Sequence, residues 1–330
     1  MSEAVAAIMF AAVILYAVFA GADFGSGTWD LVAGDARKGA ATRRLIDRAI
    51  GPVWEAHHVW LIFILVFLWT GFPGPFGTIM RELAIPFWLV GLGIVLRGSG
   101  FAFRKYAPDI GWARVAGSTF ALSSVVTPFF LGTIAGAIAS GRVGTGAEGV
   151  VWLSPTSWIG GALAVLTTTF LAGVFLAEEA RRHGADDELR ESLRKRAIVV
   201  GAITGAAALA AVVPLQADAP TLAEGLTGRG APLIIASAFG GAMTLVLLQQ
   251  GKLRAARVAA ATAVAAVVAG WGFGQYPWVL VDAVTIEDGA ANSTTLAGLL
   301  IASGVAAVIV VPALILLYRL ADSSQLGSSH

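Results

Sequence analysis

Nine long apolar segments dominate this chain and restrict it to a membrane-spanning fold. Each segment is close to the roughly 20 residues that a helix needs to cross a bilayer. Only 13% of the 330 residues are charged, against about 25% in a soluble domain. Backbone polar groups in hydrocarbon have to be paired within the protein, and a helix pairs them internally. The sequence therefore predicts an all-α, polytopic integral membrane protein with nine transmembrane helices.

The predicted spans form a single membrane domain over residues 1–330. They lie near 4–31, 50–72, 79–103, 115–139, 156–177, 197–215, 231–248, 254–274 and 294–320. No phosphate-binding loop or dinucleotide fingerprint accompanies them. The chain has no cysteine, which excludes disulfides and thiolate metal sites. We predict no metal site and no nucleic acid partner, and we assign no residue of the chain as catalytic.

Basic residues support this count of spans. All but three of the 22 Lys and Arg residues fall in alternate loops or at the span ends beside them. The exceptions are Arg81, Arg142 and Arg229. Short loops rich in Lys and Arg stay in the cytoplasm. The sequence therefore predicts an external N-terminus and a cytoplasmic C-terminus.

The start of the second span carries ionisable residues. The stretch GPVWEAHHVWLI, residues 51–62, contains Glu55, His57 and His58. Ionisable groups inside a membrane cost a few kcal/mol or more each and usually mark the path of an ion or proton. We therefore predict a proton pathway that includes Glu55 and the two histidines.

A second carboxylate joins this pathway from the first span. Counting 1.5 Å per residue, Glu55 lies about 10 Å beyond Arg48, and Asp23 lies at a comparable depth. A carboxylate that is both buried and close to a cation can hold and release a proton. Two structural alternatives stay open: Glu55 could form a salt bridge with Arg97 or Arg48, and Asp23 could cap a kink within GADFGSG.

The adjacent histidines also have two interpretations. Successive residues of a helix point about 100° apart, so His57 and His58 cannot easily face one iron atom. Hydrogen-bonded packing is the simpler interpretation, and haem ligation by one imidazole is the more specific one.

A series of motifs follows the spans in order. They are GADFGSG at 21–27, RRLIDRAIGPVWEAHHVWLI at 43–62, LRGSGFAFR at 96–104, QYP at 275–277, LVDAVTIEDGAANSTTL at 280–296 and VVPALILLY at 310–318. This ordered set resembles subunit II of the cytochrome bd quinol oxidases over nearly the whole chain.

The resemblance implies a fold of two four-helix bundles plus one helix, in a prokaryotic cytoplasmic membrane. It implies a partner, subunit I, that carries two b-type haems, one d-type haem and the quinol-binding loop. The complex would oxidise quinol and reduce dioxygen to water with cytoplasmic protons. Subunit II would bind no haem tightly. A structural quinone, membrane lipid and small single-span accessory subunits are further partners that the resemblance allows.

The resemblance also implies roles for individual residues. In the family, the acidic residue of the W-[DE] pair lies on the proton path, and this role carries over to Glu55 behind Trp54. The acidic residue of the glycine-rich motif carries over to Asp23. We regard Trp54 and Arg97 as structural residues or charge partners.

The chain departs from the family at two places. Residues 20–23 read AGAD where many members read DGFD, so one acidic position is lost. His57 and His58 stand where many members have amides, and they could extend the proton relay. Two other functions stay open: a proton-coupled secondary transporter or ion-translocating subunit, and a purely structural assembly subunit.

Overall fold

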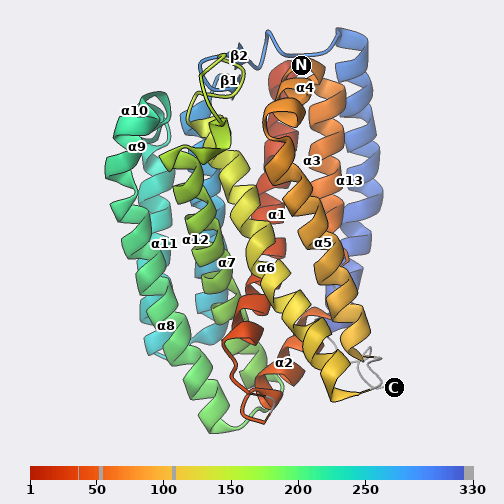
Figure 1. The fold of residues 1–330 in the computed structure, drawn as a ribbon, viewed down its shortest axis with the longest axis vertical. Coiled ribbons are helices and arrows are strands. Elements are labelled where there is room, and N and C mark those ends of the chain that lie inside the picture. Colours follow the sequence, from red (N-terminus) through yellow and green to blue (C-terminus); the bar gives the residue numbers. More distant parts are fainter. Residues whose placement is uncertain (36, 52–54, 106–108, 323–330) are drawn as a thin grey trace.

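Long helices run side by side between two ends of the molecule, as Figure 1 shows. A computed structural model of the chain describes residues 1–35, 37–51, 55–105 and 109–322. Within these residues, eight helices are long and apolar enough to cross a membrane, and a bent pair of shorter helices would make nine. The structure thus confirms a helical polytopic membrane protein.

The elements follow one another along the chain. Those of the first half are α1 (Ser2–Leu31), α2 (Ala40–Ile50), α3 (His58–Gly71), α4 (Pro73–Glu82), α5 (Ala84–Lys105), α6 (Ile110–Ala139) and the 3-10 turn η1 (Val151–Leu153). Those of the second half are α7 (Pro155–Arg182), α8 (Asp187–Ala210), α9 (Val212–Asp218), α10 (Pro220–Thr227), α11 (Ala231–Gln249), α12 (Leu253–Gln275), β1 (Trp278–Leu280), β2 (Val284–Thr285) and α13 (Ser293–Asp322).

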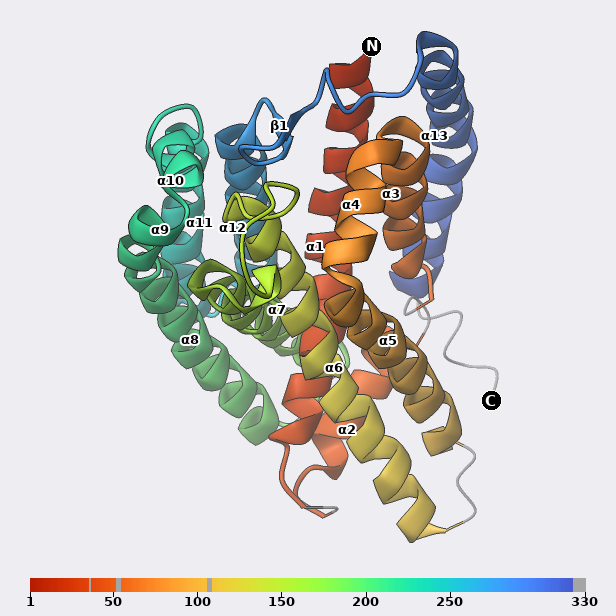
Figure 2. The same cartoon turned by 45° about the horizontal axis from the view of Figure 1, so that its top comes forward.

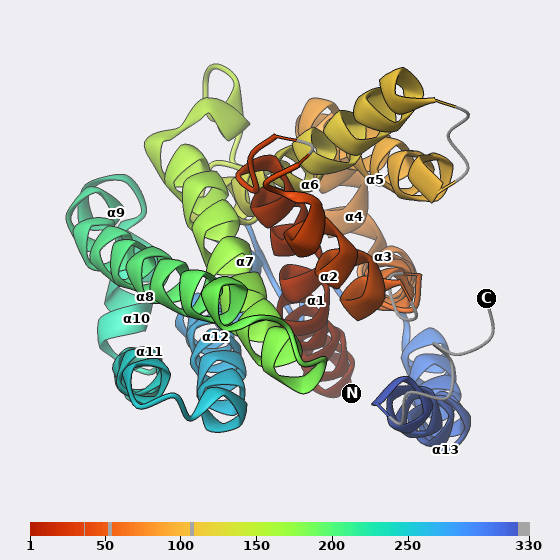
Figure 3. The same cartoon turned by 90° about the horizontal axis from the view of Figure 1, so that it is seen from below.

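The helices form two groups when the molecule is seen along the bundle in Figure 3. One group contains α1, α3, α5 and α6, and the other contains α7, α8, α11 and α12. Helix α7 joins the groups, because it packs against α1 and α6 as well as α8 and α12. Helix α13 stands to one side, beside α1 and α3 (Figure 2). This arrangement agrees with the two bundles and extra helix that the resemblance implies.

The two ends differ in charge, and we call one of them the basic end. It carries α2, the turn between α7 and α8 and the turn between α11 and α12, at the bottom of Figure 1. The opposite end carries α4, α9, α10 and the β1–β2 hairpin. There Arg142 donates to Asp218 at 2.6 Å, and Thr221 donates to Asp282 at 2.9 Å. These bonds tie the loops of the opposite end together.

Close helix contact in the interior depends on small residues. A side chain at Gly25 of α1 would place its Cβ 1.9 Å from the backbone oxygen of Thr168 on α7. Four residues further along α1, the indole N–H of Trp29 donates to the backbone oxygen of Thr169 at 2.9 Å. Small residues of this kind let membrane helices approach through their backbones. Helices α1 and α7 are therefore fixed in register along the core.

The second predicted span, near 50–72, is wrong as one continuous helix. Helix α2 ends at Ile50 and α3 begins at His58. The sequence places Pro52 between them, and proline inside a helix removes a backbone hydrogen bond and clashes with the preceding turn. After α3, the buried Phe72 leaves the helical conformation, and Pro73 starts α4 at a bend of 118°. The third span accordingly begins at Ala84 rather than near 79.

Two further segments differ from the sequence prediction. Helix α8 begins at Asp187, ten residues before the predicted sixth span, because Asp186 caps it by accepting from the Leu189 N–H at 2.8 Å. Helix α8 ends at Ala210, and the short helix α9 continues the apolar span to Asp218 before α10 begins. The loop before the last span holds the small antiparallel hairpin of β1 and β2. No strand was predicted there.

Candidate functional site

A buried ion pair joins the two sequence-predicted residues Asp23 and Arg97. Helix α1 supplies Asp23 and α5 supplies Arg97, and both residues are 1% exposed. Nη2 of Arg97 donates to Oδ1 of Asp23 at 2.6 Å and to the Asp23 backbone oxygen at 3.3 Å. Its Nε donates to Ser124 Oγ on α6 at 3.2 Å. Three helices thus meet at this pair.

Aromatic rings and small residues complete the surroundings of Arg97. Its guanidinium lies over the rings of Phe24 and Phe120, at 5.0 and 5.1 Å from their centres. Cation–π contacts of this kind are stronger when they are shielded from water. A Cβ at Gly100 would lie 2.7 Å from the Ala116 backbone oxygen, so this glycine lets α5 and α6 close around the pair. The guanidinium is therefore enclosed by the ion pair, two aromatic rings and closely packed helices.

The two histidines point to different neighbours. His57 precedes α3 and lies with Nδ1 3.5 Å from Oδ2 of Asp23, while its ring stacks on Phe19 at 6.1 Å. His58 is the first residue of α3, and its ring lies 6.5 Å from Tyr16 and 5.9 Å from Phe24. Only His57 therefore contacts the ion pair directly.

Two polar atoms beside this cluster are buried without a hydrogen-bond partner among the described residues. They are Tyr16 Oη and His58 Nδ1. Buried polar groups are normally hydrogen-bonded, so each exception calls for an explanation. Here the unused donors and acceptors belong to groups that can exchange protons. The cluster therefore has the chemical capacity of a proton relay.

Glu55 lies at the surface of the chain and not inside a helix. It falls in the turn before α3 and is exposed, two residues before the buried His57. Its side chain forms no salt bridge with Arg97 or Arg48 in the part of the chain that the structure describes. Arg97 is paired with Asp23 instead. The depth of about 10 Å predicted from helix rise does not hold, since the helix is interrupted. Trp54 lies outside the described residues.

The cap that the sequence allowed for Asp23 is not formed. Helix α1 continues without a break from Ser2 to Leu31, and Asp23 sits seven residues before Asp30 within it. The helix rise therefore separates Asp23 from Asp30 by about 10 Å along the helix. Its partner is the guanidinium of Arg97, not local backbone.

Sequence reasoning missed a second ionic cluster, at the basic end. Arg104 of α5 bonds to both Asp30 of α1 and Asp47 of α2, and Arg43 of α2 donates to Asp30 at 2.6 Å. The sequence contained a sign of this cluster. Arg104 is the last residue of LRGSGFAFR, and Asp30 lies at the end of the first apolar segment, so both were expected at the same end of the bundle. This cluster fastens α2 to the end of the bundle. It lies between the Asp23 site and the surface of that end.

These helices and their buried charges define a polytopic membrane subunit with an ionisable core. A family model described as cytochrome bd terminal oxidase subunit II matches residues 1–321. The chain belongs to this family, which confirms the resemblance predicted from the motifs.

Individual relatives agree with the family match. A putative cytochrome bd menaquinol oxidase subunit II of Bacillus subtilis (strain 168) is 26% identical over 226 residues, which cover 66% of this chain and 64% of the relative. A cytochrome bd ubiquinol oxidase subunit 2 of the same organism is 33% identical over 92 residues, which cover 28% of this chain and 27% of the relative. The aligned part is thus less than two thirds of either relative's length.

A solved structure is similar over almost the whole chain. In the structure of bd oxidase from Geobacillus thermodenitrificans, one chain matches with a TM-score of 0.80 and 25% identity. The match covers 97% of this chain and 98% of that one. The fold described above is therefore similar to an experimental structure over almost its whole length.

We predict that replacing either histidine leaves the haem content of the assembled complex unchanged. His57 faces Asp23, and His58 packs against Tyr16 and Phe24, so both imidazoles have neighbours within this chain. Pyridine haemochrome spectra of the His57→Ala and His58→Ala complexes should give the wild-type ratio of haem to protein. Loss of one haem in either variant would establish that histidine as a ligand.

Proposed function

We propose that this chain is the haem-poor subunit of a complex that oxidises quinol and reduces dioxygen to water. The family match and the full-length structural similarity support this assignment. The names of its relatives refer to menaquinol in one case and ubiquinol in the other, so quinol is the proposed electron donor. The partner is subunit I, which would hold two b-type haems, one d-type haem and the quinol-binding loop.

Within that complex, we propose that Glu55, His57 and Asp23 carry protons. The observation behind this proposal is that an exposed carboxylate, Glu55, is followed two residues later by the buried imidazole of His57. Nδ1 of His57 lies 3.5 Å from Oδ2 of Asp23. Imidazole and carboxylate groups exchange protons readily near neutral pH when their surroundings are tuned by burial and charge. Arg97 keeps a compensating positive charge beside them.

The proposed route has a surface part and a buried part. Glu55 lies where a partner subunit could contact it, and it has no ionic partner among the described residues of its own chain. His57 and Asp23 lie behind it and can accept or return a proton as the charge near the partner changes. His58 and Tyr16 extend this buried part along α1 and α3. Turnover would then consume protons from one side of the membrane only.

Purification through a tag on this chain tests the assignment to the complex. The chain should bring with it a larger haem protein that shows a d-type absorption band in the red. The preparation should consume oxygen when it is given a quinol. A stable, monodisperse chain that purifies alone and without haem would contradict the proposal and favour the transporter alternative.

We propose further that the basic end faces the cytoplasm. Nearly all basic residues lie at that end, and loops rich in Lys and Arg are retained inside. A phosphatase reporter, which is active only outside the cytoplasm, should be inactive when fused after Leu320. The same reporter inserted in the loop after Asp288, at the opposite end, should be active. The reverse pattern would invert the orientation.

A further inference from the structure

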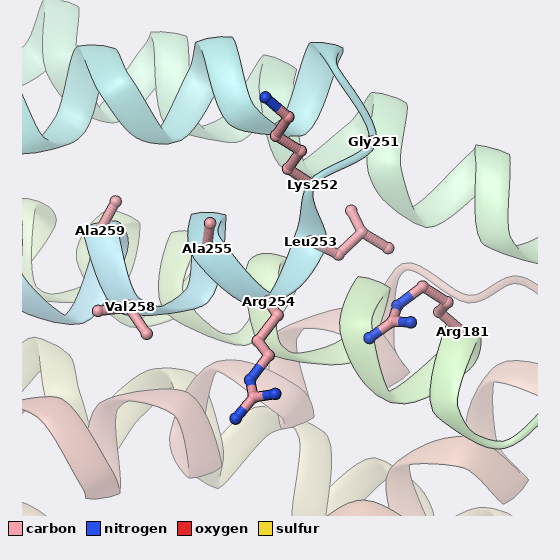
Figure 4. A pocket seen from close by; sticks show the side chains of 8 residues that line it. All are labelled: Arg181, Gly251, Lys252, Leu253, Arg254, Ala255, Val258 and Ala259. Carbon is pink, nitrogen blue, oxygen red and sulfur yellow. The ribbon is translucent and has the colours of Figure 1, made fainter.

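A shallow, widely open cavity of about 770 Å³ lies at the basic end, between the end of α7 and the start of α12. Figure 4 shows Arg181 of α7 turning its guanidinium toward the first turn of α12. Lys252 and Arg254 leave that turn in different directions. Three cationic residues therefore line one cavity, and Lys252 points away from the other two.

Two of these cations have no acidic partner of their own. Arg181 is paired with Glu178 at 3.2 Å. Lys252 and Arg254 are exposed and lie in no salt bridge among the described residues. The positive charge of the cavity is therefore only partly neutralised by the chain itself. An anionic ligand would supply the missing charge.

The rest of the cavity wall is apolar and leads toward the membrane. Ala255, Val258 and Ala259 line it from the first two turns of α12, and Val258 is 64% exposed. From Lys252 to Ala259 the helix rises about 10 Å. The cations thus stand at the level where the span begins, and the apolar wall stands beside the hydrocarbon. A ligand that fits both parts carries a negative headgroup on an apolar tail.

The walls of the cavity are fixed relative to each other. Arg257 of α12 donates to Glu179 of α7 at 3.1 Å, and its guanidinium lies 4.4 Å from the centre of the Phe175 ring. Glu179 is buried, whereas the Arg257 side chain is 42% exposed. The bond holds the end of α7 against the start of α12.

We propose that this cavity binds the headgroup of an anionic phospholipid. Basic pockets between transmembrane helices on the cytoplasmic side are typical binding places for such headgroups. The phosphate would lie at Arg181 and Arg254, with Lys252 at the rim of the site, and an acyl chain would lie along Val258. A small soluble anion could use the cations but not the apolar wall. The proposed orientation places this site in the cytoplasmic leaflet, and the site is separate from the Asp23 cluster.

Lipid titration of the delipidated, fully assembled complex tests the proposal. The probes are cardiolipin, phosphatidylglycerol, zwitterionic phosphatidylcholine and inorganic phosphate, each followed by thermal stabilisation and by native mass spectrometry. Each Lys or Arg near an anionic membrane surface contributes about fivefold to binding, so Lys252→Gln/Arg254→Gln should weaken the apparent affinity for the anionic lipids by about 30-fold.

The control removes the same charge from the same end of the molecule. Arg190 and Lys195 lie on α8 and are paired with Asp187 and Glu191. The variant Arg190→Gln/Lys195→Gln should keep wild-type lipid affinity. The charge-preserving variant Lys252→Arg/Arg254→Lys should also retain most of it. If the double glutamine variant does not assemble, the single variants Lys252→Gln and Arg254→Gln are titrated instead, each with a smaller expected loss.

Several results would overturn the proposal. Equal affinity for phosphatidylcholine would show that the cations play no part. An equal loss in the α8 control would show a general effect of net charge. Binding of inorganic phosphate with the same dependence on Lys252 and Arg254, together with displacement of the lipid, would make the site one for a soluble anion. Unchanged lipid affinity in the Lys252→Gln/Arg254→Gln complex would remove the site altogether.

Discussion

Replacing Arg97 with Met is expected to abolish most assembly of the complex. The substitution leaves the carboxylate of Asp23 buried, 1% exposed, without the guanidinium that bonds to it at 2.6 Å. Removing one partner of a buried ion pair costs about 3–5 kcal/mol, because the other charge stays uncompensated. That cost is a large part of the stability of a typical fold. Fluorescence-detected size exclusion of the tagged complex measures the assembled fraction.

Two further variants separate the ion pair from other effects of the substitution. The double variant Asp23→Asn/Arg97→Met removes both charges and should regain most of the lost assembly. The control Arg81→Met changes a side chain that is 72% exposed, and it should assemble like the wild type. Normal assembly of Arg97→Met alone would show that the pair contributes nothing to the fold. A double variant no better than the single one would assign the defect to the shape of Met.

Replacing Glu55 with Gln is expected to slow quinol-driven oxygen consumption by about tenfold or more per haem. Gln keeps the size of the side chain but cannot bind and release a proton, and a positioned acid–base group typically contributes about 10²–10⁴-fold. Glu55 is exposed and lies in no salt bridge among the described residues, so its replacement should leave assembly and haem spectra intact. Oxygen electrode measurements normalised to haem give the turnover.

The variants around Glu55 distinguish a relay from a structural role. Glu55→Asp keeps the acid and shortens the side chain by one methylene, so it should lose less activity than Gln. Glu188→Gln removes another exposed carboxylate, on α8 at the basic end, and should have wild-type turnover. If Glu55 serves only structure, Glu55→Gln will assemble poorly while its turnover per haem stays normal. Normal turnover per haem across the pH range would exclude Glu55 from the proton route.

Hydropathy predicted the long helices well because each has to satisfy its own backbone in lipid. Helices α11 and α12 begin and end within one residue of their predicted spans. The irregular elements were missed for the opposite reason. Helices α4 and α10 and the β1–β2 hairpin lie at the ends of the bundle, where water and loops also satisfy the backbone. Apolar length gives no signal for such segments.

Pairing between spans was the harder part of the site to predict. Asp23 and Arg97 were each singled out by their positions in apolar segments, but the sequence did not show that they bond to each other. Their contact depends on how α1 and α5 rotate around their axes, and close packing at positions such as Gly100 decides that rotation. The exposure of Glu55 depends on the interruption of the second span. A count along an ideal helix cannot predict such an interruption.

The Asp23–Arg97 pair also sets an order of events during synthesis. The two residues are 74 positions apart, so α1 emerges from the ribosome well before its partner on α5. At roughly 5–20 residues per second, the delay is about 4–15 s. An unpaired ionised carboxylate in hydrocarbon is costly and is normally neutralised by a proton or by a partner. We therefore expect that helix α1 reaches its final depth in the bilayer more readily once α5 has supplied the guanidinium of Arg97.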